Sequence, residues 1–446
     1  KKSVIKTNTK TKVTIEKVPL KSSKKMQSIH IKPRRDLKIL WHANSPHANS
    51  GYSVFTRDLL FRLLKDGWNV AISGYGAGVD TYHVYMNGED LIDNRFKGLK
   101  LKVYPKTPDD QQGGGMGMVD HSINFQSNVT FSMQDVWVLN PQILQRMKIW
   151  IPYTPIDKYP VPQNVLQNLQ FAYKIITFSQ FGHDALVEKG FTSTLIVEGT
   201  DTELFKPMNK QEMRDKYKIP QDIFLFGMIG ANKENPPRKG YQEAIEAFAL
   251  FQKNHPDSGI FFHTQQIQMT GFPIQALTHE LKLKNCFFVD GYTQSLNARS
   301  HDIAEEINCF DILLHPSRTE GFGLLPIEAM SCGVPAIINN TTASPEAIIA
   351  GKTGEICKTS KRWFTPDATW IYDADIPDLH ECMERLYKQL KEPNTIAQNC
   401  RDHVLEKYNI DKLFTEQWVP LLSSLQDELL PLTPTPQPST IQSVPI

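Results

Sequence analysis

The feature that most constrains the fold is a repeated alternation between short apolar runs and segments whose apolar residues recur at helical spacing. The first series opens with LKILW, continues through SVFTRDLLFRLLKDG with its closing glycine, and reaches WNVAISG. An apolar run, an amphipathic helix and a second apolar run form a β-α-β unit. Such units predict a parallel sheet with right-handed crossovers.

The alternation starts again after a polar stretch, TDTELFKPMNKQEMRDKYKIPQ, which we interpret as the linker between two domains. The second series begins with FLFGMIG and runs through YQEAIEAFALFQKNH and DILLHPS to PAIINN. A chain of 446 residues is long enough for two hydrophobic cores. We therefore predict an α/β protein with two doubly wound, Rossmann-like domains, residues 37–205 and 206–400, which face each other across a cleft. Ligands of such sheets bind beyond the carboxyl ends of the strands.

The two ends of the chain differ from this pattern. Residues 1–38 contain thirteen Lys or Arg against two acids and few large apolar residues, so we expect residues 1–36 to form a basic flexible tail. Residues 431–446 are rich in Pro, Ser and Thr and predict a second flexible tail.

Composition limits the class of protein. No run approaches the roughly 18 apolar residues of a membrane span, and no apolar core of a signal peptide follows the basic N-terminus. We therefore expect a cytoplasmic protein. The six cysteines form no C-x-x-C pair, which favours reduced, buried thiols over a zinc site or disulfides.

The most informative segment is HPSRTEGFGLLPIEAMSCGVPAI, residues 315–337. Glu320 follows an apolar strand, and Gly321 and Gly323 let backbone N–H groups turn toward a ligand. Pro326 suits the first turn of the following helix, because its missing N–H costs nothing there. A glycine-bearing loop before a helix N-terminus predicts an anion site suited to a diphosphate.

Glu328 lies in the same segment among Leu324, Leu325 and Ile327, where several faces are apolar. A buried carboxylate needs partners, and the hydroxyls of a ribose are suitable ones. A solvated glutamate on an amphipathic helix is the alternative, and the spacing alone gives both equal weight.

Glu320 and Glu328, separated by seven residues in this segment, resemble the signature of glycosyltransferase family 4, whose members are retaining enzymes of the GT-B fold. The resemblance runs from Leu37 to Tyr408. It implies that Glu320 contacts hydroxyls of the donor sugar and that Glu328 contacts the ribose of the nucleotide. It also implies that residues 401–430 form a crossover helix that returns to the N-terminal domain.

The segment GANKENPPRKGYQEAIEAF resembles the part of the family in which a lysine binds the donor diphosphate, and Lys239 matches that lysine. A cation there stabilises the nucleotide diphosphate as it leaves. The family's second cation has no clean match, because Asn232 or Lys233 occupies its region, and Arg238 is the candidate. A solvated turn is the alternative for Arg238 and Lys239.

The loop HANSPHANSGY resembles the family's opening loop, where a glycine approaches the phosphate and sugar of the donor. Gly51 takes that position, with Ser50 before it. Without the resemblance, the loop joins a strand to a helix and offers Ser53 as an N-cap. TLIVEGTDTELFKP also resembles a family segment, but Glu198 stands where the family has a histidine.

The predicted donor-binding residues are Ser50, Gly51, Arg238, Lys239, Glu320, Gly321, Phe322, Gly323, Leu324 and Glu328, and the candidate catalytic residues are Glu320, Lys239 and Asp157. Asp157 is the only carboxylate of IPYTPIDKYPVP, which we expect to line the cleft. The leaving phosphate can take the acceptor proton, so Asp157 would orient the acceptor. An aspartate that stabilises a turn is equally compatible.

Two further segments receive a structural interpretation. PDDQQGGGMGMVDH has three consecutive glycines but no β-α context, so we interpret it as a flap at the edge of the cleft. Asp373-Ala-Asp375 has the D-x-D form of a metal site, but it stands far from the donor motifs, where acids before a helix favour the helix dipole. We predict neither a metal nor a cofactor.

The sequence thus predicts a retaining, metal-independent glycosyltransferase that transfers a hexose or pentose from a UDP- or GDP-linked sugar. The acceptor stays open between a glycan, a lipid, a protein and modified DNA, and the donor's base and sugar depend on loops such as that around Tyr292. The rival hypotheses are a phosphorylase or epimerase of similar shape and a non-catalytic carbohydrate- or nucleic-acid-binding relative.

The basic tail, residues 1–36, allows two interpretations. It could bind a polyanion, either DNA or an anionic membrane to which the protein is then peripheral. A solubilising extension is the alternative, which we favour because the tail lacks interleaved aromatic residues.

Overall fold

The chain divides into two compact units, residues 1–34 and 35–446, and the fold belongs to the second. The computed structural model describes residues 34–48, 50–75, 85–88, 94–106, 115–233, 236–265, 271–289 and 300–431. Most of the basic tail, the first half of the segment PDDQQGGGMGMVDH, Tyr292 and nearly all of the C-terminal tail therefore lie outside the described residues.

The first sheet has eight strands in the order β3-β4-β2-β1-β5-β6-β7-β8, and every neighbouring pair except β3 and β4 is parallel. Its strands are β1 Lys38–Asn44, β2 Asn69–Tyr75, β3 Tyr85–Asn87, β4 Lys100–Tyr104, β5 Val129–Met133, β6 Trp150–Thr154, β7 Ile176–Thr177 and β8 Thr194–Leu195. The direction of winding reverses between β1 and β5, which makes that point the expected ligand crevice.

The helices of this domain are α1 Gly51–Asp66, α2 Gly115–Phe125, α3 Pro141–Leu144, α4 Gln163–Leu169 and α5 Gln180–Glu188, with 3₁₀ turns η2 Asn94–Phe96 and η3 Val136–Val138. The N-cap of α1 is Ser50, whose hydroxyl accepts a hydrogen bond from the Ser53 N–H, so the prediction of Ser53 as the cap was wrong. Gly115 begins α2 after β4, so the glycine loop does have a β-α context, contrary to our prediction.

The second sheet has six parallel strands in the order β11-β10-β9-β12-β13-β14. These strands are β9 Phe224–Ile229, β10 Ser258–His263, β11 Cys286–Phe288, β12 Ile312–His315, β13 Ala336–Asn339 and β14 Gly354–Cys357. The associated helices are α6 Lys210–Lys216, α7 Tyr241–Asn254, α8 Ile274–Glu280, α10 Ser300–Ile307, α11 Leu324–Ser331 and α12 Ile376–Lys391, with the 3₁₀ turn η4 Ser344–Ala347. Its winding reverses between β9 and β12, and α10, a short and polar helix, was missing from our prediction.

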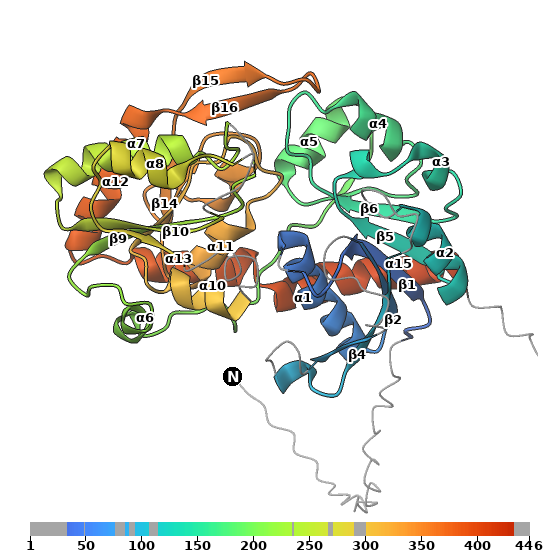
Figure 1. Ribbon diagram of the computed structural model, residues 1–446. Coiled ribbons are helices and arrows are strands. Elements are labelled where there is room, and N and C mark those ends of the chain that lie inside the picture. The colour runs from blue at the N-terminus through green and yellow to red at the C-terminus, as the bar shows by residue number, and fades with distance from the viewer. Residues whose placement is uncertain are drawn as a thin grey trace, which may run out of the picture. The chain divides into compact units, whose positions relative to one another are not determined.

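A two-stranded hairpin follows the second sheet. β15 Thr359–Phe364 and β16 Trp370–Ala374 pair with each other in antiparallel fashion and form a separate sheet (Figure 1).

The chain crosses between the two sheets after β8 and again after α13 (Ile396–Lys407). The two crossing segments pair through the Thr200 N–H, which donates to the Tyr408 carbonyl at 2.9 Å, and the Ile410 N–H, which donates to the Thr200 carbonyl at 3.1 Å. A Cβ atom at Gly199 would lie 2.9 Å from the Ile410 Cα, so the close approach requires glycine.

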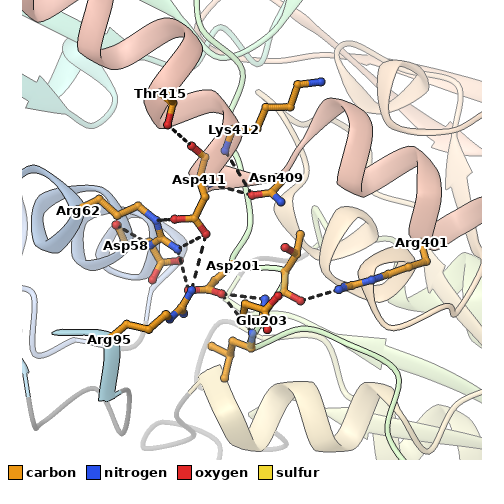
Figure 2. A network of polar contacts seen from close by, with 12 residues as sticks. Asp58, Arg62, Arg95, Asp201, Glu203, Arg401, Asn409, Asp411, Lys412 and Thr415 are labelled. Carbon is orange, nitrogen blue, oxygen red and sulfur yellow. Dashed lines mark hydrogen bonds and ion pairs between the residues drawn. The ribbon is translucent and has the colours of Figure 1, made fainter. Parts of the chain in front are cut away.

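An ion-pair network fixes this crossing to the first domain (Figure 2). The Arg62 guanidinium of α1 lies 3.0 Å from the Asp201 carboxylate and 2.7 Å from the Asp411 carboxylate. Arg95 of η2 also contacts Asp201. Burial alone would raise the pKa of Asp201, but the charges of Arg62 and Arg95 outweigh it and lower that pKa, so Asp201 stays ionised between them.

The C-terminal residues return to the first sheet, as the resemblance implied. The predicted helix over 401–430 is a series of segments: α13, then α14 Ile410–Leu413, the π-helical turn η5 Phe414–Trp418 and α15 Val419–Leu429. The Trp418 ring packs edge-on against Trp41 and Tyr153 of the first sheet, with centroids 5.8 and 5.1 Å apart, and Figure 1 shows α15 beside β1. Among the described residues, no helix combines the length and apolar character that crossing a membrane requires.

We expect Trp418→Ala to lower the free energy of unfolding by about 3–5 kcal/mol, because loss of the fully buried ring leaves a cavity between η5 and the first sheet. Urea unfolding followed by circular dichroism measures the change. The matched control is Trp137→Ala, which removes a ring that is 51% exposed and should change stability by less than about 1 kcal/mol. Equal losses in the two variants would contradict the role assigned to Trp418.

Candidate active site

Two adjoining cavities lie beyond the carboxyl ends of the strands. The inner cavity, of about 630 Å³, is lined from both domains, among others by Ser50, Gly51, Glu198, Lys239, Glu320 and Glu328. The hairpin cavity, of about 660 Å³, is lined among others by Asp135, Trp137, Asp157, Lys158, Arg238 and Asp367. Both cavities are lined by Tyr52, Asp135, Pro155, Arg238, Glu320 and Gly321, so they are contiguous at these residues.

Glu320 is buried where the two cavities meet, in the loop after β12. Its carboxylate lies 2.6 Å from the Lys239 ammonium and 3.1 Å from the Arg238 guanidinium, and His315 Nε2 lies 3.1 Å away. Burial alone would raise the pKa of Glu320, but Arg238 and Lys239 outweigh it and hold the pKa well below its usual range. The carboxylate therefore stays ionised.

His315 ends strand β12 and contacts Glu320. Burial, reinforced by the charge of Lys239, lowers the pKa of His315, so its ring stays neutral beside the cations. A neutral ring can share a hydrogen bond with Glu320 without adding charge.

Buried Arg318 holds the loop that carries the two cations. Its guanidinium donates to the Pro237 carbonyl at 2.6 Å and pairs with Glu243 of α7 and Asp373 of β16, each at 2.5 Å. The Arg318 N–H also donates to the Arg238 carbonyl at 2.8 Å. Arg238 and Lys239 do lie in a turn, but its backbone is held by these hydrogen bonds, and both side chains pair with Glu320, Arg238 while 35% exposed.

Gly321 and Gly323 are each required for a different geometric reason. Gly323, in the left-handed region at φ 95°, is the N-cap of α11. A Cβ atom at Gly321 would lie 2.4 Å from the Pro155 Cβ, so glycine lets this loop touch the first domain. Phe322 and Leu324 line the inner cavity beside these glycines. The structure therefore places the four predicted donor-binding residues 321–324 at one cavity.

Glu328 on α11 and Glu198 after β8 are two further buried carboxyls of the inner cavity, 7% and 6% exposed. Burial raises the pKa of both to about 8, and Glu328 adds to the shift of Glu198. Glu328 is therefore not a solvated residue of a helix face, and the alternative interpretation is wrong. Its carboxyl has no hydrogen-bond partner among the described residues, so it can accept one from a ligand.

Ser50 and Gly51 face this site from the first domain, at the N-terminus of α1. The Ser50 hydroxyl is 3.0 Å from the Asn44 amide and 2.8 Å from the Ser53 hydroxyl, which fixes the start of the helix. Gly51 is exposed in the inner cavity, and a Cβ atom added to it would meet no described atom within 4 Å.

Asn232 and Lys233, which stand where the resembling family has its second diphosphate-binding cation, have different roles. The Asn232 side chain is buried and bonds to the Gln265 carbonyl and to both backbone groups of Phe272, so it has a structural role. Lys233 lines the inner cavity, and Arg238 contacts Glu320, so both of these cations lie at the site.

The predicted Asp157 lines the hairpin cavity, not the inner one, and a second aspartate lies with it. Asp135 follows β5 and is 3.4 Å from the Tyr52 hydroxyl. Burial and the neighbouring Asp157 raise the pKa of Asp135 to about 6, and burial also raises the pKa of Asp157. The two carboxyls thus share one poorly solvated space.

The β15–β16 hairpin forms one wall of this cavity and contacts the first domain there. The Lys158 ammonium lies 2.7 Å from the Asp367 carboxylate, and the Trp370 N–H donates to the Tyr159 carbonyl at 3.0 Å. The hairpin residues Thr365, Pro366, Asp367 and Ile371 line the cavity.

The D-x-D residues have structural partners. Asp373 pairs with Arg318, and Asp375 is the N-cap of α12, where its side chain accepts from the Asp378 N–H. Within the described ranges, His301, Asp302 and Glu305 of α10 form the one group whose ligand atoms lie close enough for a metal. Glu305 already pairs with Lys216, and none of the three lines either cavity.

Sequence reasoning missed Asp135, Tyr52, His315 and the Lys158–Asp367 pair, and it gave Glu198 no role. Asp135 could have been found, because it follows β5 as Asp157 follows the neighbouring parallel strand β6. The contact of the hairpin with residues 158–159 joins segments about 200 residues apart, and no local pattern signals it.

Comparisons with known proteins find similarity to glycosyltransferases. A family model for glycosyl transferases of group 1 matches residues 209–363. The capsular polysaccharide biosynthesis glycosyltransferase CapM of Staphylococcus aureus is 24% identical over 253 residues, which cover 55% of this chain and 57% of that protein. The chain thus spans about half the length, or less, of the curated relatives it matches.

Two solved structures share the fold. A sucrose-phosphate synthase from Thermosynechococcus elongatus has a TM-score of 0.68 at 16% identity, over 87% of this chain and 100% of that chain. HepE of Anabaena in complex with UDP and glucose has a TM-score of 0.62 at 16% identity, with the same coverage of both chains. The two domains of this chain therefore have the GT-B arrangement that we predicted.

The buried carboxyls predict how stability depends on pH. Glu198 and Glu328 keep their protons to about pH 8 in the folded protein, whereas the unfolded chain releases them near pH 4.3. Between these two pKa values the folded state binds more protons than the unfolded state. The free energy of unfolding should therefore fall by about 1.4 kcal/mol per pH unit for each carboxyl as the pH rises from about 5 to about 8.

Urea unfolding of the wild type and of Glu198→Gln at about pH 5.5 and about pH 8 measures this slope. Because the glutamine at position 198 cannot ionise, the variant should lose less stability than the wild type between the lower and the higher pH. Glu381→Gln is the matched control, since its side chain is 71% exposed and it should keep the wild-type slope. An unchanged slope in Glu198→Gln would rule out a neutral Glu198.

Proposed function

We propose that the chain is a group 1 glycosyltransferase, a retaining, metal-independent enzyme that transfers a sugar from a nucleotide diphosphate sugar. The match of the family model to residues 209–363 and the GT-B fold support this proposal. One observation carries the proposal. The ionised Glu320 carboxylate and the cations Lys239 and Arg238 converge beyond the ends of β12 and β9, opposite the N-terminus of α1.

The donor occupies the inner cavity in this proposal. Lys239, with Arg238 and the N–H groups at the start of α11, binds the diphosphate, because cations and a helix N-terminus both favour anions. The ion pairs with Glu320 keep both cations at the site before the donor arrives. Glu328, whose buried carboxyl has no hydrogen-bond partner in the described part of the chain, accepts a hydrogen bond from the ribose.

Glu320 itself contacts the hydroxyls of the sugar that is transferred. The acceptor hydroxyl attacks the anomeric carbon from the side on which the diphosphate leaves, and the bond from that carbon to the phosphate oxygen breaks. The leaving phosphate takes the acceptor proton, so no separate base is needed. Lys239 and Arg238 stabilise the negative charge that develops on the diphosphate. Asp157 orients the acceptor from the hairpin cavity.

We expect Glu320→Gln to lower turnover roughly 100-fold or more while the Kd for UDP or GDP changes little, because the lost contact is with the transferred sugar. Glu328→Gln should instead weaken binding of the nucleotide. Calorimetry with UDP and GDP, together with rates of transfer or donor hydrolysis from UDP-glucose and GDP-mannose, separates the two effects. The control Glu381→Gln should match the wild type in both measurements.

Near-normal turnover of Glu320→Gln would contradict the assignment of the motif. Binding of nucleotide sugars without transfer or hydrolysis would favour a non-catalytic relative of the same fold.

Activity should survive treatment with EDTA, because Lys239, Arg238 and the α11 N-terminus carry the charge that a metal would otherwise neutralise. The measurement is the rate of nucleoside diphosphate release before and after EDTA, and again after addition of Mg²⁺ or Mn²⁺. Full loss in EDTA that either metal restores would overturn the metal-independent mechanism.

A further inference from the structure

We infer that the hairpin cavity is the acceptor subsite and that it takes a neutral, hydroxyl-rich ring, a sugar without phosphate or carboxylate groups, against Asp135, Asp157 and Trp137. This inference rests on the proposed function, because it names the substrate class of the same site. It narrows the range of acceptors that the sequence leaves open.

The charges that line the hairpin cavity favour a neutral acceptor over an anionic one. Among the described residues the lining has four carboxyls, Asp135, Asp157, Glu320 and Asp367, against the two cations Lys158 and Arg238. Each cation already pairs with a carboxylate, Lys158 with Asp367 and Arg238 with Glu320. A phosphate or carboxylate on the acceptor would therefore meet an excess of negative charge.

Asp135 and Asp157 suit hydroxyl groups instead. They follow the adjacent strands β5 and β6, so both face the space beyond the same edge of the sheet. Carboxylate oxygens accept hydrogen bonds from O–H groups, and such bonds to a charged acceptor are strong. Both side chains lie partly buried in the wall of the cavity, so the hydroxyl groups of a sugar would take the place of water there.

The remaining lining fits the apolar faces of a ring. Trp137 lines the cavity with about half of its side chain exposed, and Pro155, Ile156 and Pro366 add apolar surface. An exposed aromatic side chain supplies a large contact area at low entropic cost, and its polar N–H can still reach water or a hydroxyl.

The hairpin completes the subsite. It closes one side of the cavity, and the Lys158–Asp367 ion pair and the Trp370–Tyr159 backbone bond tie it to the first domain. The volume of about 660 Å³ is typical of a small-molecule site, within the range of roughly 300–1,000 Å³. Glu320 and Gly321 line both cavities, so a ring here lies beside the donor sugar.

The test compares neutral sugars with their phosphates. The full chain is incubated with UDP-glucose or GDP-mannose and with matched pairs of acceptors: glucose and glucose 6-phosphate, mannose and mannose 6-phosphate, and the p-nitrophenyl glycosides of both sugars as larger neutral acceptors. Release of UDP or GDP above the acceptor-free rate is measured. At least one neutral sugar should give a kcat/KM about tenfold or more above that of its phosphate.

Asp135→Asn should raise the acceptor KM about tenfold and reduce the discrimination against phosphates. Trp137→Phe is a second variant, which should raise the acceptor KM without affecting the donor. The matched control is Asp120→Asn, which removes one exposed carboxylate of α2 outside both cavities and should leave every constant unchanged.

Equal or better use of the phosphorylated sugars, or no stimulation by any neutral sugar, would overturn the inference. So would an equal effect of Trp137→Phe on acceptor use and on donor hydrolysis, because Trp137 lines the hairpin cavity and not the inner one. If neither donor is bound or hydrolysed, the proposed function itself fails. Donor hydrolysis with a preference for phosphorylated acceptors refutes only the inference about this subsite.

Discussion

Both cavities have walls from two sheets, so the geometry of the site depends on the place where the chain crosses between them. There Arg62 of α1 is buried between Asp201 and Asp411, one from each crossing segment. The two segments also pair with each other through Thr200. A buried cation with two carboxylate partners is costly to separate, because removal of one partner leaves an uncompensated charge. The crossing therefore holds both crossing segments against the C-terminal part of α1.

Within the site, the surroundings of each glutamate decide whether its carboxyl is ionised or protonated. Glu320 lies among Arg238 and Lys239 and is ionised. Glu328 and Glu198 are as deeply buried but lack such cations in the described part of the chain, and they keep their protons near neutral pH. The cavity thus has a charged end, which suits a diphosphate and a developing charge, and a neutral end, which suits hydroxyl groups.

The parts of the molecule that local patterns specify were predictable. The alternation of apolar runs and amphipathic helices predicted both parallel sheets, and the segment with Glu320 and Glu328 predicted the loop and helix that the structure contains. Lys239 and Arg238 were assigned to the same site from a separate segment, and they contact Glu320.

The parts that depend on tertiary contacts were not predictable from local pattern. α10 is short and polar, and its helical form depends on packing in the second domain. Ser50 replaces Ser53 as the cap, since both can serve and the geometry of the loop decides. The contact of the hairpin with residues 158–159 has no local signal, and the ionisation of each glutamate depends on neighbours that the folded chain supplies.

The hairpin contact has a mechanical consequence. The first domain is attached to the second at the crossing near Thr200 and, separately, at the hairpin, where the Trp370 N–H bonds to the Tyr159 carbonyl. Two further contacts join the domains: the Thr319 hydroxyl donates to the Asp157 carbonyl, and the Glu346 carboxylate accepts from the Gln180 and Phe181 N–H groups. Attachments at several separate places restrict rotation of one domain against the other as well as their separation. A wider opening of the cavities therefore requires these contacts, among them the partly exposed Lys158–Asp367 ion pair, to break.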